Sequence, residues 1–256
     1  MIKKRIIPKI LLNESLKTGR IYSGTSVKYH DFKVVGDPES QSEIFQDTIS
    51  DELMVLSTRL SNIDFQKVLQ TLDKICNQAL MPVSYGGSIT DIEQINKIFD
   101  IGVERVIFGR SLRSFPKVVE ETANRFGSQA VVASIDYLEN SANSIPKLGQ
   151  ILIRHDLSLT NELTWVESLG AGEICLSDVN SDGTMKGSNL RILQQARENT
   201  ALPIIQNCGI GKTSHFVEAF KLGAEAVAVG SYFAFLDQNF IEIRSHIKNS
   251  GINIRL

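Results

Sequence analysis

The residues best suited to chemistry lie in the stretch Glu173–Gly187. Asp178 and Asp182 follow a short apolar run, Ile174–Leu176, and precede a helical pattern that begins at Asn189. The apolar run is too short for a helix and is typical of a buried strand. Carboxylates at the end of a strand, just before a helix, are typical of functional sites in α/β proteins. The backbone N–H groups at the start of the helix are free to bind an anion at the same place. A polar turn with an Asx-type cap is the alternative interpretation.

Glycine-bearing turns follow four other predicted strands. Two lie in the first half of the chain, at Gly86–Ser88 and Gly109–Ser111, and two lie in the second half, at Cys208–Gly211 and Gly230–Ser231. Glycine lets a phosphate approach backbone N–H groups closely, and the helix that follows adds partial positive charge. If the two pairs of turns lie on opposite sides of the opening of one site, they predict a long ligand with a phosphate at each end. The candidate phosphate-binding residues are Gly86, Gly87, Gly109, Arg110, Gly183, Thr184, Gly209, Gly230 and Ser231.

These turns need a framework of alternating strands and helices. The apolar periodicity predicts strands over Arg5–Leu12, Glu52–Ser57, Pro82–Tyr85, Arg105–Phe108, Ala130–Asp136, Glu173–Ser177, Pro203–Asn207 and Ala226–Val229. Amphipathic stretches between them predict helices over Phe65–Leu80, Asp91–Ile101, Pro116–Phe126, Asn161–Leu169, Asn189–Asn199, Ser214–Leu222 and Phe240–Asn249. Eight such units in 256 residues predict a single (β/α)8 TIM barrel in the α/β class. A doubly wound sheet is the alternative.

An internal repeat supports the barrel. The segment 98–109 resembles the segment 219–230, and the offset of 121 residues also pairs Glu52 with Glu173 and Gly87 with Cys208. An offset near half the chain length predicts one barrel domain built from two half-barrels, about 1–125 and 126–256.

The amino-acid composition limits the kinds of partner, cofactor and cellular location that we expect. The chain is 42% hydrophobic and 22% charged, with a formal net charge of −2, which predicts a soluble protein without a nucleic-acid partner. It has no run of 18 apolar residues and its first residues lack a signal-cleavage pattern, so we expect a cytoplasmic protein that does not enter a membrane. Three cysteines and four histidines show no ligand spacing, and neither a metal nor a cofactor is predicted.

Several charged residues are expected to point into the barrel. Arg5, Glu52, Arg105 and Glu173 each begin a predicted strand, and charges at a barrel floor are costly unless they pair. Strand alternation also places Lys9 inside, with Asp136 or Glu173 as its expected partner. Lys9 either neutralises a buried carboxylate or narrows an internal passage.

Nine motifs, in the same order along the chain, carry a family resemblance. They are RIIP at 5–8, GDP at 36–38, DEL at 51–53, YGGSI at 85–89, RFGSQ at 125–129, ID at 135–136, GAGEI at 170–174, DGT at 182–184 and IRL at 254–256. Over its whole length the chain resembles the cyclase subunit of imidazole glycerol phosphate synthase. The resemblance implies a half-barrel-duplicated (β/α)8 lyase whose substrate has two phosphates. It also implies a glutaminase subunit docked on the N-terminal barrel face, with Arg5, Glu52, Arg105 and Glu173 as the gate of an ammonia passage.

The departures from the family pattern concern the opposite end of the barrel. Two aspartates share the acid–base work in the family, and Asp136 matches the second, but Leu11 stands at the position of the first. Leucine cannot transfer a proton, and loss of one member of such a pair typically costs about 10²–10⁴-fold in rate. Further changes fall on Ser23, Ser57, Gly109-Arg110, Cys208-Gly209 and His155–Leu157.

Three functions are compatible with this pattern. The resemblance favours a paralogue that docks a glutaminase and conducts ammonia to an acceptor, for a sugar amidotransferase of polysaccharide biosynthesis, with a phosphorylated small molecule at its loops. The second is the histidine-pathway lyase, with Asp136 acting alone or helped by Asp178, Asp182 or Lys9. The third is a non-catalytic scaffold that activates the glutaminase.

Overall fold

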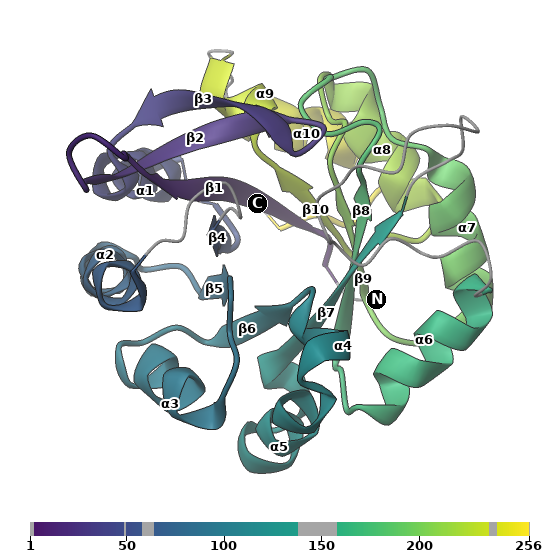
Figure 1. Cartoon of the computed structure of the whole chain (residues 1–256). Coiled ribbons are helices and arrows are strands. Elements are labelled where there is room, and N and C mark those ends of the chain that lie inside the picture. Colours follow the sequence, from purple (N-terminus) through teal and green to yellow (C-terminus); the bar gives the residue numbers. More distant parts are fainter. Residues whose placement is uncertain (1–2, 49, 58–63, 138–157, 236–239, 256) are drawn as a thin grey trace.

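The computed structural model describes residues 3–48, 50–57, 64–137, 158–235 and 240–255, and these form a closed parallel β-barrel with an outer ring of helices (Figure 1). The barrel strands are β1 (Arg5–Glu14), β4 (Leu53–Ser57), β5 (Val83–Gly86), β6 (Arg105–Phe108), β7 (Val131–Tyr137), β8 (Glu173–Asp178), β9 (Ile204–Asn207) and β10 (Ala226–Val229). Each strand pairs with the next in this order, and β10 closes the barrel on β1, with Arg5 opposite Ala226 and Pro8 opposite Val229.

Alternation along the strands separates two apolar regions. A small cluster fills the barrel interior and consists of Ile7, Met54, Ile107, Val132, Cys175, Ile205, Ala226 and Ala228. The strand residues between them, such as Ile6 and Ile10 on β1, belong to a larger cluster that packs beneath the helices. The period-2 alternation therefore decides which side chains line the bore and which ones hold the helices.

Helices cover the outer surface of the barrel (Figure 1). They are α1 (Pro38–Asp47), α2 (Phe65–Gln78), α3 (Ile92–Asp100), α4 (Ser111–Ser114), α5 (Pro116–Phe126), α6 (Leu159–Ser168), α7 (Leu190–Asn199), α8 (Thr213–Lys221), α9 (Ser231–Phe235) and α10 (Phe240–Asn249), with a 3-10 turn at Ser128–Ala130. Side-chain N-caps begin several of them: Asp64, Asp91, Ser158 and Asn189 each accept a hydrogen bond from a backbone N–H of the first turn.

An antiparallel hairpin extends the sheet beyond the barrel. Strands β2 (Ile21–Val27) and β3 (His30–Gly36) follow β1, and β2 pairs with the end of β1, with Leu11 opposite Gly24. The tip of the hairpin has an unusual backbone, because Lys28, Tyr29 and Asp31 all have positive φ. The hairpin lies beside β1 and α9 at one end of the barrel (Figure 1).

The predicted TIM barrel is confirmed, and the doubly wound alternative is wrong because β10 closes on β1. All eight predicted strands and seven helices occur, with ends that differ by up to two residues. The hairpin, α1, α4 and α9 were not predicted. His155–Leu157, one of the departures from the family pattern, lies outside the described residues.

Candidate active site

A cavity of about 270 Å³ opens at the end of the barrel where the strands finish. Its rim includes the turns after β5 and β6, and its lower wall includes Met54, Ile107 and Cys175 of the interior cluster. The polar groups that line it between these levels include Ser57, Ser134, Asp136, Ser177 and Asn207. The cavity therefore extends from the mouth into the bore, and a bound molecule would meet hydroxyl, amide and carboxyl groups there.

Asp136, at the end of β7, is the sequence-predicted acid–base residue, and it lines this cavity. Its Oδ1 accepts a hydrogen bond from the hydroxyl of Tyr29 at 3.0 Å. Burial raises the pKa of Asp136 from 3.8 to about 7, against the opposing effects of hydrogen bonds from Tyr29 and Ser177. Burial and the nearby Asp136 carboxylate also raise the pKa of the Tyr29 phenol well above 10.0. Near pH 7 this carboxyl can both give and take a proton, as general acid–base catalysis requires.

Sequence reasoning missed Tyr29, which the hairpin tip carries into the mouth. Its backbone N–H donates to Asp182 Oδ2 at 3.2 Å, and the hydroxyl of Ser26 donates to the same oxygen at 2.7 Å. The N–H of Lys28 donates to the carbonyl oxygen of Asp182 at 3.0 Å. Asp182 thus holds the hairpin tip in a left-handed conformation and points Tyr29 at Asp136. No local sequence pattern signals this contact, because it joins residues 107 positions apart.

Asp178 and Asp182, the two carboxylates predicted at the end of β8, are only 2% and 3% exposed. Asp178 Oδ2 accepts hydrogen bonds from the Ser181 hydroxyl at 2.6 Å and from the Asn189 N–H at 2.7 Å. Asp178 is therefore the Asx-type cap of this turn. Asp182 folds back toward the barrel axis and lines the cavity.

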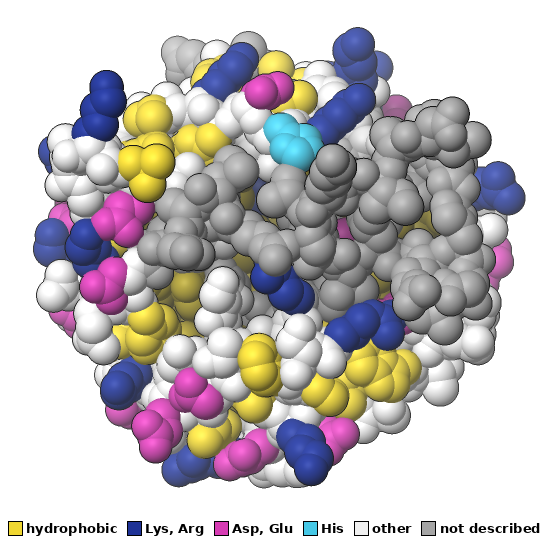
Figure 2. Space-filling model, viewed as in Figure 1, with side chains coloured by type: hydrophobic (Ala, Val, Ile, Leu, Met, Phe, Trp, Pro, Cys, Tyr) yellow, Lys and Arg dark blue, Asp and Glu magenta, His cyan; other side chains and the backbone are white. Residues whose placement is uncertain are grey.

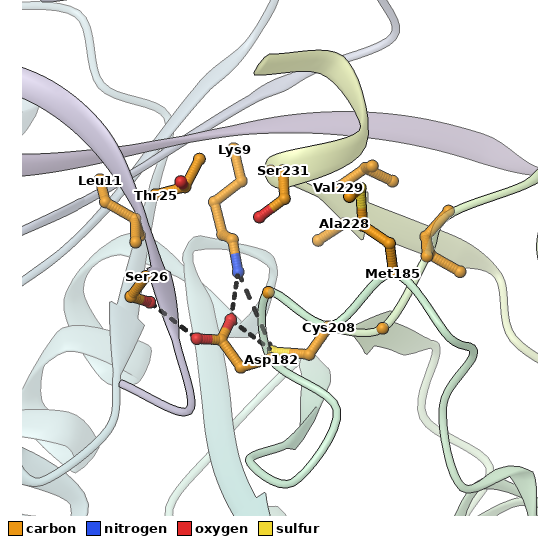
Figure 3. Close-up of a pocket in the computed structure, with 14 residues that line it drawn as sticks. Lys9, Leu11, Thr25, Ser26, Asp182, Met185, Cys208, Ala228, Val229 and Ser231 are labelled. Atoms are coloured by element: carbon orange, nitrogen blue, oxygen red, sulfur yellow. Dashed lines mark hydrogen bonds and ion pairs between the residues drawn. The ribbon is translucent and has the colours of Figure 1, made fainter. Parts of the chain in front are cut away.

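Lys9 points into the bore, as alternation predicted, but its expected partners were wrong. Its Nζ donates to Asn207 Oδ1 at 2.9 Å. The same Nζ lies 3.8 Å from Asp182 Oδ1 (Figure 3). Asp136 is instead bound by Tyr29, and Glu173 is bound at the floor of the barrel. Burial opposes the charge on Lys9, but the neighbouring Cys208 and Asp182 outweigh it, so the pKa of Lys9 lies above its ordinary value.

Leu11 lines the mouth at the position where the resembled family has its first aspartate. It is 8% exposed and borders the cavity together with Leu56. The two serines at other departures form local bonds: Ser23 donates to the carbonyl oxygen of Gly36 at 3.1 Å, and the Ser57 hydroxyl lies 2.9 Å from that of Tyr85. This side of the mouth is therefore apolar where a second carboxylate would stand.

The predicted phosphate-binding residues divide between two spaces of unequal size. Gly86, Gly87, Gly109 and Arg110 line the cavity of about 270 Å³. Gly183, Gly209, Gly230 and Ser231 line a smaller, adjoining space beside Lys9, which shares Lys9, Leu11, Ser26 and Asp182 with that cavity (Figure 3). Thr184 lines neither, and its hydroxyl donates to the carbonyl oxygen of Ser181 at 2.9 Å.

At the opposite end of the barrel, the four predicted floor residues form a closed ring of ion pairs. Arg5 binds both Glu52 and Glu173, and Arg105 lies 3.3 Å from Glu52 Oε2 and 2.8 Å from Glu173 Oε2. Burial raises the pKa of Glu173, while the neighbouring Arg5 and Arg105 oppose this shift. Two positive and two negative side chains alternate, so each charge has two partners. The attraction between these partners offsets the cost of removing the charges from water.

Other chemistries have little support in the described part of the chain. There, no group of three or more His, Cys, Asp and Glu side chains is arranged to hold a metal ion. The same residues include no helix with the length and apolar character to span a bilayer. Positive and negative side chains are interspersed around the rim in the space-filling view (Figure 2).

Comparisons with known proteins agree with this architecture. Residues 5–239 match the family model described as histidine biosynthesis protein. A Prochlorococcus marinus (strain MIT 9313) protein, provisionally named imidazole glycerol phosphate synthase subunit hisF2, is 33% identical, and the match covers 100% of this chain and 99% of that protein. The imidazole glycerol phosphate synthase subunit HisF of Thermotoga sp. (strain RQ2) is 31% identical, with 100% and 99% covered. The chain therefore belongs to the histidine biosynthesis protein family and is a homologue of the HisF subunits of imidazole glycerol phosphate synthase.

Proposed function

We propose that this protein is the barrel subunit of a glutamine amidotransferase complex that conducts ammonia without forming an imidazole ring. A glutaminase would dock on the N-terminal barrel face, around the ring of Arg5, Glu52, Arg105 and Glu173. Ammonia would pass the ring, enter the bore and leave at the mouth toward an acceptor held by a third enzyme. A sugar amidotransferase of polysaccharide biosynthesis fits this role.

The observation that carries the proposal is the contrast between the two ends of the barrel. At the floor, each of the four charged side chains of the ring contacts two side chains of opposite charge. At the mouth, Leu11 presents an apolar side chain at the position of the family's first catalytic aspartate. Asp182 also lines the cavity, but its carboxylate is bound by Ser26 and the Tyr29 N–H and is paired with Lys9. A cavity that reaches from the mouth to Met54 and Ile107 supports a route through the bore.

A second candidate, the histidine-pathway lyase, is favoured by the contact between Tyr29 and Asp136. A phenol that donates to a carboxyl with a pKa of about 7 can substitute for a pair of carboxylates. In this reading Asp136 would be the acid–base group and Tyr29 would donate to the developing negative charge on the substrate.

The experiment is to purify the chain with a glutaminase encoded beside it and to measure two rates separately. Glutamate release reports the docked glutaminase, and imidazole formation from the substrate of imidazole glycerol phosphate synthase, with glutamine or ammonium salt, reports ring closure. We expect the barrel to stimulate glutamate release and to form no imidazole. Robust imidazole formation that Asp136→Asn abolishes would establish the lyase instead.

Genetic complementation provides an independent readout. The proposed conduit should not restore growth of a histidine auxotroph that lacks its own cyclase subunit, whereas a lyase should. A HisF subunit from the same host serves as the positive control. Failure of the chain to bind any co-encoded glutaminase would contradict both the conduit and the scaffold.

A further inference from the structure

We infer that an acidic surface of the enzyme that accepts the ammonia docks over α4 and covers the opening of the barrel cavity. The docking surface, called the α4 patch, consists of Arg110, Arg113, Phe115, Lys117 and Trp165. The inference rests on the proposed function, because it specifies where the third enzyme of that complex binds. It concerns the outer rim and assigns no ligand to the cavity itself.

The opening of the cavity lies beside α4. Arg110, Ser111, Ser114 and Phe115, which precede, form and follow this helix, all line the cavity of about 270 Å³. On the other side of the mouth, the tip of the β2–β3 hairpin is bound to Asp182 in the turn after β8 (Figure 1). A small molecule that leaves the bore through this cavity therefore emerges within reach of the α4 patch.

The α4 patch combines aromatic side chains with exposed positive charges. Phe115 is 39% exposed, although it is a large apolar residue. Arg110, Arg113 and Lys117 are exposed as well, on a chain whose formal net charge is −2. Figure 2 shows positive side chains beside hydrophobic ones over α4 and the neighbouring part of α6. Aromatic residues and arginine contribute much of the affinity in protein interfaces, so this composition favours a protein partner.

Arg113 is held in place before any partner arrives. Its Nη2 donates a hydrogen bond to Oε2 of Glu162, which is 3% exposed, and its guanidinium carbon lies 4.8 Å from the centre of the Trp165 ring. The arginine side chain is nevertheless 36% exposed. A side chain that is fixed before binding loses less conformational entropy in the complex. Arg113 can therefore offer further N–H donors to a carboxylate of the partner at a small entropic cost.

The chemistry of ammonia and the charge of the patch identify the occupant. Ammonia that escapes into water at neutral pH is protonated and loses its nucleophilic lone pair, so the acceptor enzyme has to close the opening against solvent. The α4 patch borders this opening, whereas the glutaminase is proposed to bind at the other end of the barrel. The positive charges of Arg110, Arg113 and Lys117 are complementary to acidic residues on the partner.

The test is calorimetric titration of the barrel–glutaminase complex with the sugar amidotransferase encoded beside it. Phe115→Ser should weaken binding at least about tenfold, because an aromatic contact in the interface is lost. Lys117→Glu should weaken it at least about threefold, and added salt should weaken the wild type more than this variant. Both side chains are exposed, so both variants are expected to fold.

The opposite rim of the mouth provides matched controls. Phe235, at the end of α9, is 48% exposed, and Lys33 of β3 lies 5.9 Å from the centre of its ring. Phe235→Ser and Lys33→Glu make the same changes far from α4 and should alter the affinity by less than about twofold. Equal losses in the two pairs of variants would overturn the inference. Absence of measurable binding between the wild-type complex and the sugar amidotransferase would also overturn it.

Two other occupants of the α4 patch give different results. If a second copy of the chain binds there, the barrel alone sediments as a dimer in analytical ultracentrifugation and Phe115→Ser returns it to a monomer. If the glutaminase binds there, Phe115→Ser reduces glutamine hydrolysis. Either result would overturn the inference. We expect a monomeric barrel, and glutamine hydrolysis that this variant leaves unchanged.

A trapping assay separates the inference from the proposed function. Glutamate dehydrogenase with its substrates, added to the solution, consumes ammonia that escapes from the complex. It should leave the yield of aminated product nearly unchanged with the wild type and lower it with Phe115→Ser. If ammonia is transferred but Phe115→Ser and Phe235→Ser behave alike, the conduit stands and the docking surface fails. Binding that depends on Phe115, in a complex that transfers no ammonia, would show the reverse.

Discussion

Asp136 is the residue whose protonation most directly connects the structure with measurable behaviour. It lies inside the barrel, partly open to the cavity, and the hydroxyl of Tyr29 donates a hydrogen bond to it. Because water is largely excluded there, the charged carboxylate is less stable than it would be in the unfolded chain. This cost has a defined pH dependence.

We predict that Asp136→Asn stabilises the protein at pH 8 and not at pH 4. The pKa of this carboxyl is 3.8 when unfolded and about 7 when folded, so the native state loses stability as the pH rises between these values. The gain at pH 8 is at most about 4 kcal/mol, at 1.36 kcal/mol per pKa unit, and smaller to the extent that cavity water screens the charge. Asparagine can still accept the bond from Tyr29.

Urea unfolding of the wild type and the variant at the two pH values measures this difference. Asp31→Asn, an exposed carboxylate at the hairpin tip, should change the free energy of unfolding by less than about 0.5 kcal/mol at both. A gain from Asp136→Asn that is equal at pH 4 and pH 8 would show that the carboxyl is not buried as described.

Lys9 and Asp182 give a second prediction at this scale. Lys9→Met should destabilise the protein by about 3–5 kcal/mol, because a buried carboxylate loses its charged partner. The double variant Lys9→Met, Asp182→Asn should lose less than the sum of the two single variants, since neither buried charge is then unpaired. The surface pair of Lys74 and Glu39 is the control, and Lys74→Met should leave the free energy of unfolding nearly unchanged, because water screens that pair. Additive losses at Lys9 and Asp182 would show that the pair is not coupled.

At the scale of elements, the β2–β3 hairpin positions the site. Its tip is bound to the turn after β8 through Ser26, Lys28 and Tyr29, all of which contact Asp182. Gly183 makes this approach possible, because a Cβ there would lie 2.1 Å from the carbonyl oxygen of Ser26, and its φ is +70°.

Gly183→Ala should therefore detach the hairpin tip from the turn. We expect a loss of about 1–3 kcal/mol from backbone strain and the steric conflict, and faster hydrogen exchange at Lys28 and Tyr29. Gly36→Ala in β3 is the matched control, since a Cβ there meets no atom within 4 Å. Unchanged exchange at the tip in Gly183→Ala would mean that the contact with Ser26 does not hold the hairpin.

The elements also show how far the sequence alone could lead. Strands and helices with clear periodicity, such as α5 and α10, were located to the residue, because apolar spacing depends only on neighbours along the chain. The hairpin was missed because β3 is mostly exposed and so lacks a buried face. Tyr29 and the partners of Lys9 could not be found, since both contacts depend on where the turn after β8 returns over the mouth.

At the scale of the whole molecule, the barrel places a charged floor, an apolar interior layer and a polar cavity along one axis. This sequence of layers favours the passage of a small neutral molecule over an ion, because an ion would lose its hydration in the apolar layer. A side chain that blocks the bore therefore distinguishes an ammonia conduit from a non-catalytic scaffold.

We predict that Ser134→Trp reduces ammonia transfer to the acceptor while glutamine hydrolysis continues. Ser134 lines the cavity within the bore, and an indole ring there would fill much of the path. Ser168→Trp, on the exposed side of α6, is the control and should leave both rates unchanged. The measurement compares glutamate release with aminated product in the reconstituted complex. A scaffold without conduction would show the same ratio for both variants.

The hydrogen bonds between Asp182 and the hairpin tip also have a consequence for folding during translation. Ser26 and Asp182 are 156 positions apart, so the hairpin tip emerges from the ribosome long before the residue that anchors it. Contacts of such long sequence separation form late, because the intervening chain must first be ordered. During translation the tip therefore has no anchor until more than two thirds of the polypeptide has been made, and Tyr29 acquires its orientation only as the nascent barrel closes.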